Sequence, residues 1–222
     1  MRIIFVRHGE PDYENDCLTS LGHIQAEAVA KRLSKEVIQK IYSSPMGRAR
    51  QTMQKFADQN PSLPVTILDF MHEITWGSID GNPIPQDGHP WDCANEMVMQ
   101  GLNICDSEWN KSQYFCNNKA TLEVERIAKE IDAWLFTLGY SREGLYYRNI
   151  QNKDTALQTV VLFSHGGSSC AAMAHMLNLP FPFMCASVHL PFTAVTILRL
   201  DSKPGSLSVP VAELVGDSNH LP

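Results

Sequence analysis

The stretches "RIIFVRHGE" (residues 2–10) and "TVVLFSHGG" (residues 159–167) follow one pattern. Each contains a short run of apolar residues, and each ends in a histidine followed by glycine. Short, uniformly apolar runs are typical of strands buried on both faces of a parallel sheet. Ligands bind beyond the carboxyl ends of such strands. If the two strands are neighbours, we therefore expect His8 and His165 to face one crevice.

The rest of the chain alternates between strand-like and helix-like segments. Apolar runs predict further strands at 40–44, 65–68 and 193–200, and helical spacing predicts helices at 18–33, 45–60, 121–139 and 168–177. This alternation predicts an α/β fold, a three-layer α/β/α sandwich with a mostly parallel central sheet. Residues 140–154 are interpreted as a polar connection, and the tail from Ser202 as peripheral.

The segment from Gly77 to Asn118 lacks a regular pattern. Its first part, "GSIDGNPIPQDGHPWD" (77–92), is rich in Gly, Pro and Asp and is predicted to be a loop, with a helix near 92–101. We predict a single domain over residues 1–222 with an inserted cap or substrate segment at about 80–118. The aromatic residues of this insertion, such as Trp91, have two open interpretations, local core or substrate contact.

Composition limits the class of partner. The 222 residues include 18 Lys and Arg against 24 Asp and Glu, a formal net charge of −6. Such a chain is a poor candidate for binding nucleic acid or anionic membranes. No apolar run approaches the roughly 18 residues that a membrane span requires. Six cysteines without a C-x-x-C pair are interpreted as free thiols in the cytoplasm. The oligomeric state stays open, with a dimer as one alternative.

Positively charged and imidazole side chains follow several predicted strands: Arg7 and His8 the first, Arg48 and Arg50 the second, and His165 the late one. Guanidinium groups bind phosphate oxygens bidentately and stay charged, so this set suits a phosphate-like dianion. Each motif alone is weak, because R-H-G or H-G-G often marks a surface turn and arginines at a helix start are often solvated. Their joint placement at strand ends favours an anion site.

A histidine with an unprotonated ring nitrogen can attack phosphorus as a nucleophile, and the leaving oxygen then needs a proton. Glu73, which follows the third strand, is our candidate proton donor, with Asp80 and Glu10 as rivals. Such a donor needs a pKa raised by burial, which neighbouring arginines would oppose. His189, just before the last strand, is a further residue that could reach the site.

Five pieces of the sequence, taken in order, resemble the histidine phosphatase superfamily, also called phosphoglycerate mutase-like proteins. They are "FVRHGE" (5–10), "LTSLGHIQA" (18–26), "YSSPMGRARQT" (42–52), "MHEITWGSIDG" (71–81) and "VLFSHGG" (161–167). The resemblance implies that His8 is the nucleophile that becomes phosphorylated, and that Glu73 protonates the leaving group and then activates water. It implies that Arg7, Arg48 and His165 hold the phosphate during catalysis, and that no metal or other cofactor takes part. Secondary candidates are Gly9, Glu10, Arg50, Gly166 and His189.

Departures from the family pattern favour a phosphatase. Asp80 stands in "GSIDG" where the family usually has Glu, the nucleophile loop continues as "EPDYEN" where mutases typically have a Trp-Asn pair, and "SHGG" replaces the A-H-G-N of mutases. The leading hypothesis is a metal-independent phosphomonoesterase that hydrolyses a small phosphorylated metabolite through a phosphohistidine on His8. Two alternatives stay open: a mutase-like phosphotransferase, and a non-catalytic protein that binds phosphoesters.

Overall fold

The computed structural model of the protein describes residues 1–152 and 158–221. In the following order, η denotes a short 3-10 helix. The elements are β1 (Arg2–Arg7), β2 (Pro11–Asp12), β3 (Cys17–Leu18), α1 (Ser20–Leu33), β4 (Lys40–Ser43), α2 (Gly47–Ala57), β5 (Val65–Ile67), η1 (Asp69–Met71), η2 (Pro85–Gly88), α3 (Pro90–Met99), η3 (Trp109–Lys111), α4 (Lys119–Thr137), β6 (Tyr140–Glu143), β7 (Tyr146–Asn149), β8 (Thr159–Ser164), α5 (Gly166–Leu177), α6 (Phe181–Ser187), β9 (Val195–Arg199), β10 (Leu207–Ser208) and β11 (Val211–Asp217).

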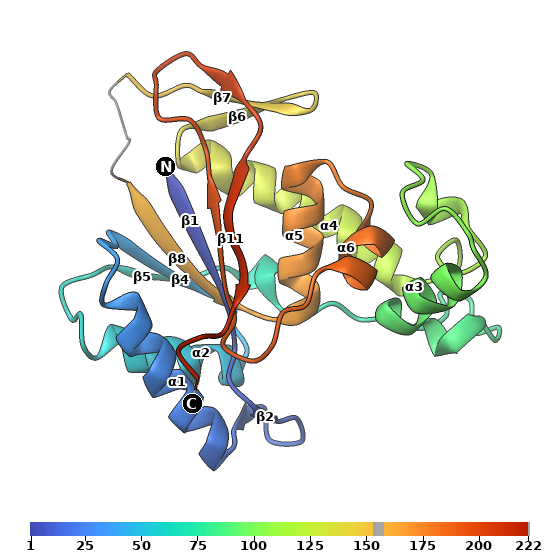
Figure 1. Ribbon diagram of the computed structural model, residues 1–222, viewed down its shortest axis with the longest axis horizontal. Coiled ribbons are helices and arrows are strands. Elements are labelled where there is room, and N and C mark those ends of the chain that lie inside the picture. Colours follow the sequence, from blue (N-terminus) through green and yellow to red (C-terminus); the bar gives the residue numbers. More distant parts are fainter. Residues whose placement is uncertain (153–157, 222) are drawn as a thin grey trace.

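The central sheet has six strands in the order β11-β9-β1-β8-β4-β5. Strands β1, β8, β4 and β5 run parallel, and β9 pairs antiparallel with both β1 and β11. Strands β1 and β8 lie side by side with Arg7 opposite Ser164, so the expected neighbour relation of the two His-Gly motifs is confirmed. The chain leaves both strands at the same edge of the sheet, where His8 and His165 follow (Figure 1).

Two apolar layers cover the two faces of this sheet. Because successive side chains of a strand point to opposite faces, Ile4 and Val6 pack with residues of α1 and α2. Ile3 and Phe5 pack on the other face with residues of α4 and α5. Figure 1 shows these two helix layers on either side of the strands. The predicted α/β/α sandwich with a mostly parallel sheet is therefore confirmed.

The turn after β1 packs tightly against the start of α1. A Cβ added to Gly9 would lie 2.5 Å from the carbonyl oxygen of Gly22, so only glycine permits this backbone approach. Thr19 caps α1 by accepting a hydrogen bond from the Gly22 N–H at 3.0 Å. The Gly9 N–H donates to the Thr52 hydroxyl of α2 at 3.0 Å. These contacts fix the backbone next to His8.

Two segments that the sequence predicted to be irregular form strands. In place of a polar connection after residue 139, β6 and β7 form an antiparallel hairpin that turns at Gly144, whose φ is 60°; residues 153 and 154 of that connection lie outside the described part. In place of a peripheral tail, β11 pairs with β9 at the edge of the main sheet. Both predictions were wrong because these strands carry mostly exposed or half-exposed side chains and lack a buried apolar run. Helix α6 was not predicted.

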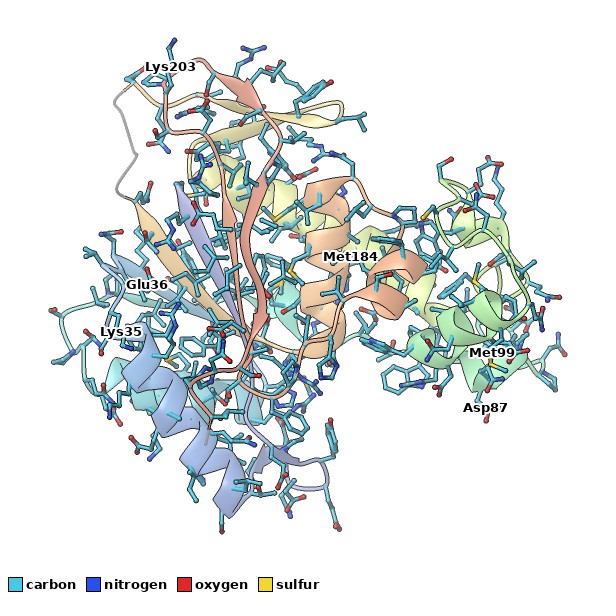
Figure 2. The ribbon with its side chains drawn as sticks, in the orientation of Figure 1. Lys35, Glu36, Asp87, Met99, Met184 and Lys203 are labelled. Atoms are coloured by element: carbon cyan, nitrogen blue, oxygen red, sulfur yellow. The ribbon has the colours of Figure 1, made fainter. Side chains whose placement is uncertain are left out.

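Residues 80–118 contain η2, α3 and η3 and project away from the sheet (Figure 1). An isolated antiparallel bridge joins Ser78 to Asn118 at the base of this segment, and the Asn118 side chain donates to the Gly88 carbonyl at 2.8 Å. Figure 2 shows Asp87 and Met99 at its outer end, and Met99 is 82% exposed. The division into one domain with a cap stays a prediction. Among the described helices, none is both long and apolar enough to cross a bilayer.

Candidate active site

The two histidines predicted to share a crevice lie next to each other. Their ring centroids are 5.1 Å apart, with an interplanar angle of 60°. His8 is 1% exposed and His165 is fully buried. The His8 backbone N–H donates to the Ser164 carbonyl at 2.9 Å, which links the end of β1 to the end of β8. The parallel pairing of two strands therefore sets the separation of the imidazoles.

The hydrogen bonds of His8 assign its neutral tautomer. Nδ1 lies 2.7 Å from the Gly9 carbonyl oxygen, which can only accept, so Nδ1 carries the proton. Nε2 therefore presents a lone pair, toward which Arg48 Nε–H points at 3.4 Å. Burial, opposed by the Gly9 carbonyl and aided by the charges of Arg7 and Arg48, lowers the pKa of His8 to about 3. The ring is therefore neutral at pH 7, with Nε2 unprotonated as a nucleophile requires.

His165 is also held neutral, but a neighbour binds its Nε2 and not its Nδ1. Its Nε2 lies 2.7 Å from the Ser44 hydroxyl, and that hydroxyl already accepts from the Met46 N–H at 3.2 Å. We assign the Ser44 proton to the bond with Nε2, which places the His165 proton on Nδ1. This Nδ1 is buried without a partner among the described residues. Burial and the neighbouring positive groups lower the pKa of His165 far below its ordinary value. His165 thus offers one unused N–H donor.

The two buried histidines make the stability of the fold sensitive to acid. In the unfolded chain each takes up a proton near pH 6.5, whereas the folded state keeps His8 neutral down to about pH 3. The unfolded state therefore binds more protons between these limits. For each unit by which the pH is lowered in this range, we expect the free energy of unfolding to fall by up to about 1.4 kcal/mol per histidine. Urea unfolding at pH 7, 5 and 4 measures this slope. His8→Asn should reduce this slope, whereas the exposed-site control His23→Asn should not. Equal slopes in both variants would contradict the lowered pKa of His8.

Arg48, the arginine predicted to bind phosphate, is held by a residue that sequence reasoning missed. Arg48 is 5% exposed, and its Nη1 lies 2.5 Å from Oδ1 of Asp16. The other oxygen of Asp16 accepts from the Gly47 N–H at the start of α2 at 2.6 Å. The Asp16 carboxylate thus fixes both the guanidinium and the helix that carries it. No local motif marks Asp16, because its role depends on the packing of the loop before α1 against α2.

We expect Asp16→Asn to weaken phosphate binding more than it slows turnover. The amide keeps the size of the side chain but loses the charge that orients Arg48, so KM should rise about tenfold while kcat changes by less than about threefold. Steady-state kinetics and inhibition by inorganic phosphate measure the two effects. Glu14→Gln is the matched control, since Glu14 is exposed in the same loop. A variant with an unchanged KM would show that Asp16 does not position Arg48.

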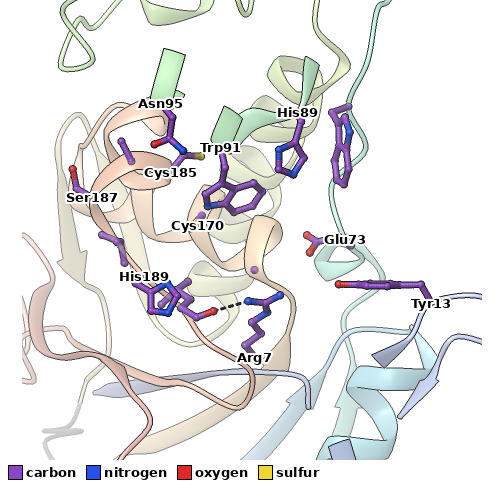
Figure 3. Close-up of a pocket in the computed structure, with 15 residues that line it drawn as sticks. Arg7, Tyr13, Glu73, His89, Trp91, Asn95, Cys170, Cys185, Ser187 and His189 are labelled. Atoms are coloured by element: carbon purple, nitrogen blue, oxygen red, sulfur yellow. Dashed lines mark hydrogen bonds between the residues drawn. The ribbon is translucent and has the colours of Figure 1, made fainter. Parts of the chain in front are cut away.

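Arg7, the last residue of β1, is held by the segment that precedes β9. Its Nη1 donates to the Leu190 carbonyl at 2.6 Å (Figure 3), and its guanidinium lies 4.4 Å from the centroid of the Phe192 ring. Its Nε is buried without a partner among the described residues. A Cβ on Gly166 would lie 3.6 Å from this guanidinium, within ordinary contact distance. Arg7 is thus held in place and retains an unused donor.

Glu73 lies at the N-terminus of α5, which begins two residues earlier than predicted. Oε1 accepts from the N–H groups of Ile74 and Ser168 at 3.0 and 2.9 Å, and Oε2 accepts from the Gly167 N–H at 3.2 Å. Burial raises the pKa of Glu73, and these N–H groups together with Arg48 oppose the rise. A Cβ on Gly167 would lie 2.7 Å from Oε1, so the glycine makes room for the carboxyl group.

The remaining candidates separate into two groups. His189 is exposed and lines the same cavity as Arg7 and Glu73, as does Gly166. The predictions of Glu10, Arg50 and Asp80 as site residues are not supported, because each is directed elsewhere. Glu10 accepts from the Thr19 hydroxyl at 2.8 Å, and Arg50 is exposed on α2. Asp80 accepts hydrogen bonds from Ser78 and Asn82 of its own turn and from the distant Asn117. Those bonds lower the pKa of Asp80, which disfavours it as a proton donor.

A cavity of about 490 Å³ extends outward from Arg7, Glu73 and Gly166. Figure 3 shows Tyr13 near Glu73 on one side and His189 on the other, with Trp91 and His89 at the outer end. Sequence reasoning had left Trp91 open between core and substrate contact. Its ring packs against the hydrophobic core and also lines the cavity, so contact with a substrate stays a prediction. The other lining residues of the outer end were not predicted, because their loop positions carry no periodic signal.

The comparisons with known proteins agree with this arrangement. The family model described as histidine phosphatase superfamily (branch 1) matches residues 3–94, which include Arg7, His8, Arg48 and Glu73. Over these residues the chain is similar to the histidine phosphatase superfamily, so the resemblance drawn from its motifs is confirmed.

Two curated relatives are similar to parts of the chain. A mannitol-1-phosphatase of Eimeria tenella is 36% identical over 156 residues, covering 57% of this chain and 50% of the relative. A probable phosphatase of Schizosaccharomyces pombe is 28% identical over 90 residues, covering 36% of this chain and 43% of the relative. The matches thus span half or less of the length of these relatives. Among solved structures, one described as mycobacterial hydrolase 1 has a TM-score of 0.68 at 22% identity, covering 98% of this chain and 99% of its own, which supports the fold.

Proposed function

We propose that the protein is a phosphomonoesterase that hydrolyses a small phosphorylated metabolite through a phosphohistidine on His8. One observation carries the proposal: the unprotonated Nε2 of His8, whose Nδ1 proton is held by the Gly9 carbonyl, lies beside the Arg48 guanidinium. A neutral imidazole next to buried positive charge suits attack on an electrophile that arrives with negative charge. The names of the two curated relatives, both phosphatases, support the same class of activity.

The proposed reaction has two steps. In the first, the Nε2 lone pair of His8 forms a bond to phosphorus, the P–O bond to the alcohol breaks, and the protonated carboxyl of Glu73 gives its proton to the leaving oxygen. In the second, water gives a proton to the Glu73 carboxylate and attacks phosphorus, and the P–N bond breaks. The products are the alcohol and inorganic phosphate, and His8 returns to its starting form. Both steps need in-line geometry, which the fixed His8 ring supports.

Negative charge that develops on the phosphoryl oxygens has protein donors to meet it. Arg7 Nε and His165 Nδ1 are both buried donors without a partner among the described residues, and Arg48 contributes a fixed positive charge. In a buried site such donors stabilise a transition state strongly. This supply of charge supports the proposal that no metal ion or other cofactor is required. The absence of nucleic-acid and membrane partners and the cytoplasmic location stay predictions from the sequence.

The test is an assay of purified protein on p-nitrophenyl phosphate and a panel of metabolite phosphates, with and without EDTA. The proposal expects release of inorganic phosphate that EDTA does not reduce, and an acid-labile phosphoprotein after rapid denaturation. Activity that EDTA abolishes would refute metal independence. Binding of phosphoesters without release of phosphate would favour the non-catalytic alternative. A long-lived phosphoprotein that transfers its group to added alcohols faster than to water would favour a phosphotransferase.

A further inference from the structure

The outer half of the cavity has an aromatic wall made by Trp76, His89 and Trp91. The Trp76 and His89 ring centroids are 5.1 Å apart in an edge-to-face arrangement, and those of His89 and Trp91 are 5.7 Å apart at 37°. His89 Nδ1 lies 2.6 Å from the Asp92 carboxylate. The three side chains include no Lys or Arg, and they present aromatic faces to the cavity.

The rest of the outer half carries uncharged hydrogen-bonding groups. Asn95 extends from α3, and Ser187 stands at the end of α6 (Figure 3). Both side chains are exposed at the cavity. An amide and a hydroxyl can each donate and accept, which matches the hydroxyl groups of an alcohol.

The fixed charges of the cavity are confined to its inner end. Among the described residues that line it, Arg7 is the sole Lys or Arg and Glu73 the sole Asp or Glu. Arg7 and Arg48 are the groups that the proposed function assigns to the phosphoryl group. A second anionic group on the substrate would lie in the outer half without a lysine or arginine among the described lining residues to pair with it, which is costly in a partly desolvated site.

We infer that the alcohol released from the phosphoester is an uncharged polyhydroxylated one, a sugar or sugar alcohol. Its C–H faces would pack on the aromatic wall, and its hydroxyl groups would bond to Asn95 and Ser187. Pockets that combine aromatic walls with a few placed polar groups select by this combination of shape and hydrogen bonding. The inference rests on the proposed function for the position of the phosphoryl group, and it adds the class of the leaving group.

The test compares four esters of primary alcohols: mannitol 1-phosphate, glucose 6-phosphate, 3-phosphoglycerate and benzyl phosphate. We expect kcat/KM for the two sugar esters to exceed that for the carboxylate-bearing ester and for the hydroxyl-free ester by at least tenfold. A value for 3-phosphoglycerate or benzyl phosphate equal to or above the sugar esters would overturn the inference.

The variant Asn95→Lys tests the charge argument. A lysine at this exposed position would supply the missing cation, so the preference for sugar esters over 3-phosphoglycerate should shrink at least fivefold. Met99→Lys is the matched control, because it adds the same charge to the same helix at an exposed position that does not line the cavity. An equal shift in both variants, or none in Asn95→Lys, would count against the inference.

Titration calorimetry of the same esters with the His8→Ala variant separates this inference from the proposed function. If the wild-type protein hydrolyses none of the esters but the variant binds the sugar esters at least tenfold more tightly than 3-phosphoglycerate, the proposed function fails and the inference stands. If the wild type hydrolyses esters without preferring sugar esters, the proposed function stands and the inference fails.

Discussion

Replacing His8 with alanine is expected to lower kcat by about 10⁴-fold or more. Among the described residues, no other side chain holds an unprotonated nucleophilic nitrogen beside Arg48. The acid-labile phosphoprotein should disappear at the same time. Inorganic phosphate should still bind, since Arg7, Arg48 and His165 are unchanged. Single-turnover kinetics on p-nitrophenyl phosphate, together with calorimetry of phosphate binding, measure these three results.

The control for His8→Ala is His23→Ala, which removes an exposed imidazole from α1. We expect its kcat to stay within about twofold of wild type. Because His8 is buried, the thermal midpoint of each variant should be measured alongside, so that loss of fold is not mistaken for loss of chemistry. A His8→Ala protein that folds and keeps more than about one per cent of wild-type kcat would exclude His8 as the nucleophile.

Replacing Glu73 with glutamine should slow the reaction by an amount that depends on the leaving group. For alkyl phosphates we expect kcat to fall about 10³-fold, because the amide cannot give a proton to the alkoxide. For p-nitrophenyl phosphate, whose leaving group needs no proton, the loss in the first step should be below about tenfold. Burst kinetics on both kinds of ester measure the difference, since water attack on the intermediate loses its base in either case.

The same substitution should change the pH profile. Glu73 donates its proton in the acid form, and burial raises its pKa above the ordinary value. The rate of the first step on alkyl esters should therefore fall as pH rises through that raised pKa, and Glu73→Gln should remove this limb. Asp80→Asn, which alters the rival carboxyl group, is the control and should retain it. A limb that persists in Glu73→Gln and vanishes in Asp80→Asn would transfer the role of proton donor to Asp80.

Much of the fold was predictable because its central strands carry their own signal. Strands β1 and β8 are short and uniformly apolar, and burial on both faces of a parallel sheet requires such a run. Because a histidine and a glycine follow each of these strands, both imidazoles were predicted to lie at the carboxyl ends of the strands of the central sheet. Arg48 and Glu73 were found by the same reasoning, since each follows a neighbouring strand.

The features that the sequence did not predict depend on interactions between distant segments. Asp16 contacts Arg48 only after the loop before α1 packs against α2, and nothing in the sequence near residue 16 indicates a partner. Strand β11 has register shifts and exposed side chains, so it is recognised only by its pairing with β9. The aromatic wall is missed for a similar reason, because Trp76 and His89 come from irregular backbone whose course is set by the bridge between Ser78 and Asn118.

The pairing of β1 with β8 has a consequence for the order in which the chain acquires its site. Arg2 pairs with Thr159, and β9, the other neighbour of β1, is still later in the sequence. Loop closure over such distances is entropically costly, and proteins with many long-range contacts fold slowly. During synthesis the segment that carries His8, Arg48 and Glu73 emerges well before β8. The imidazoles of His8 and His165 can therefore meet only late in folding, when β8 inserts between β1 and β4.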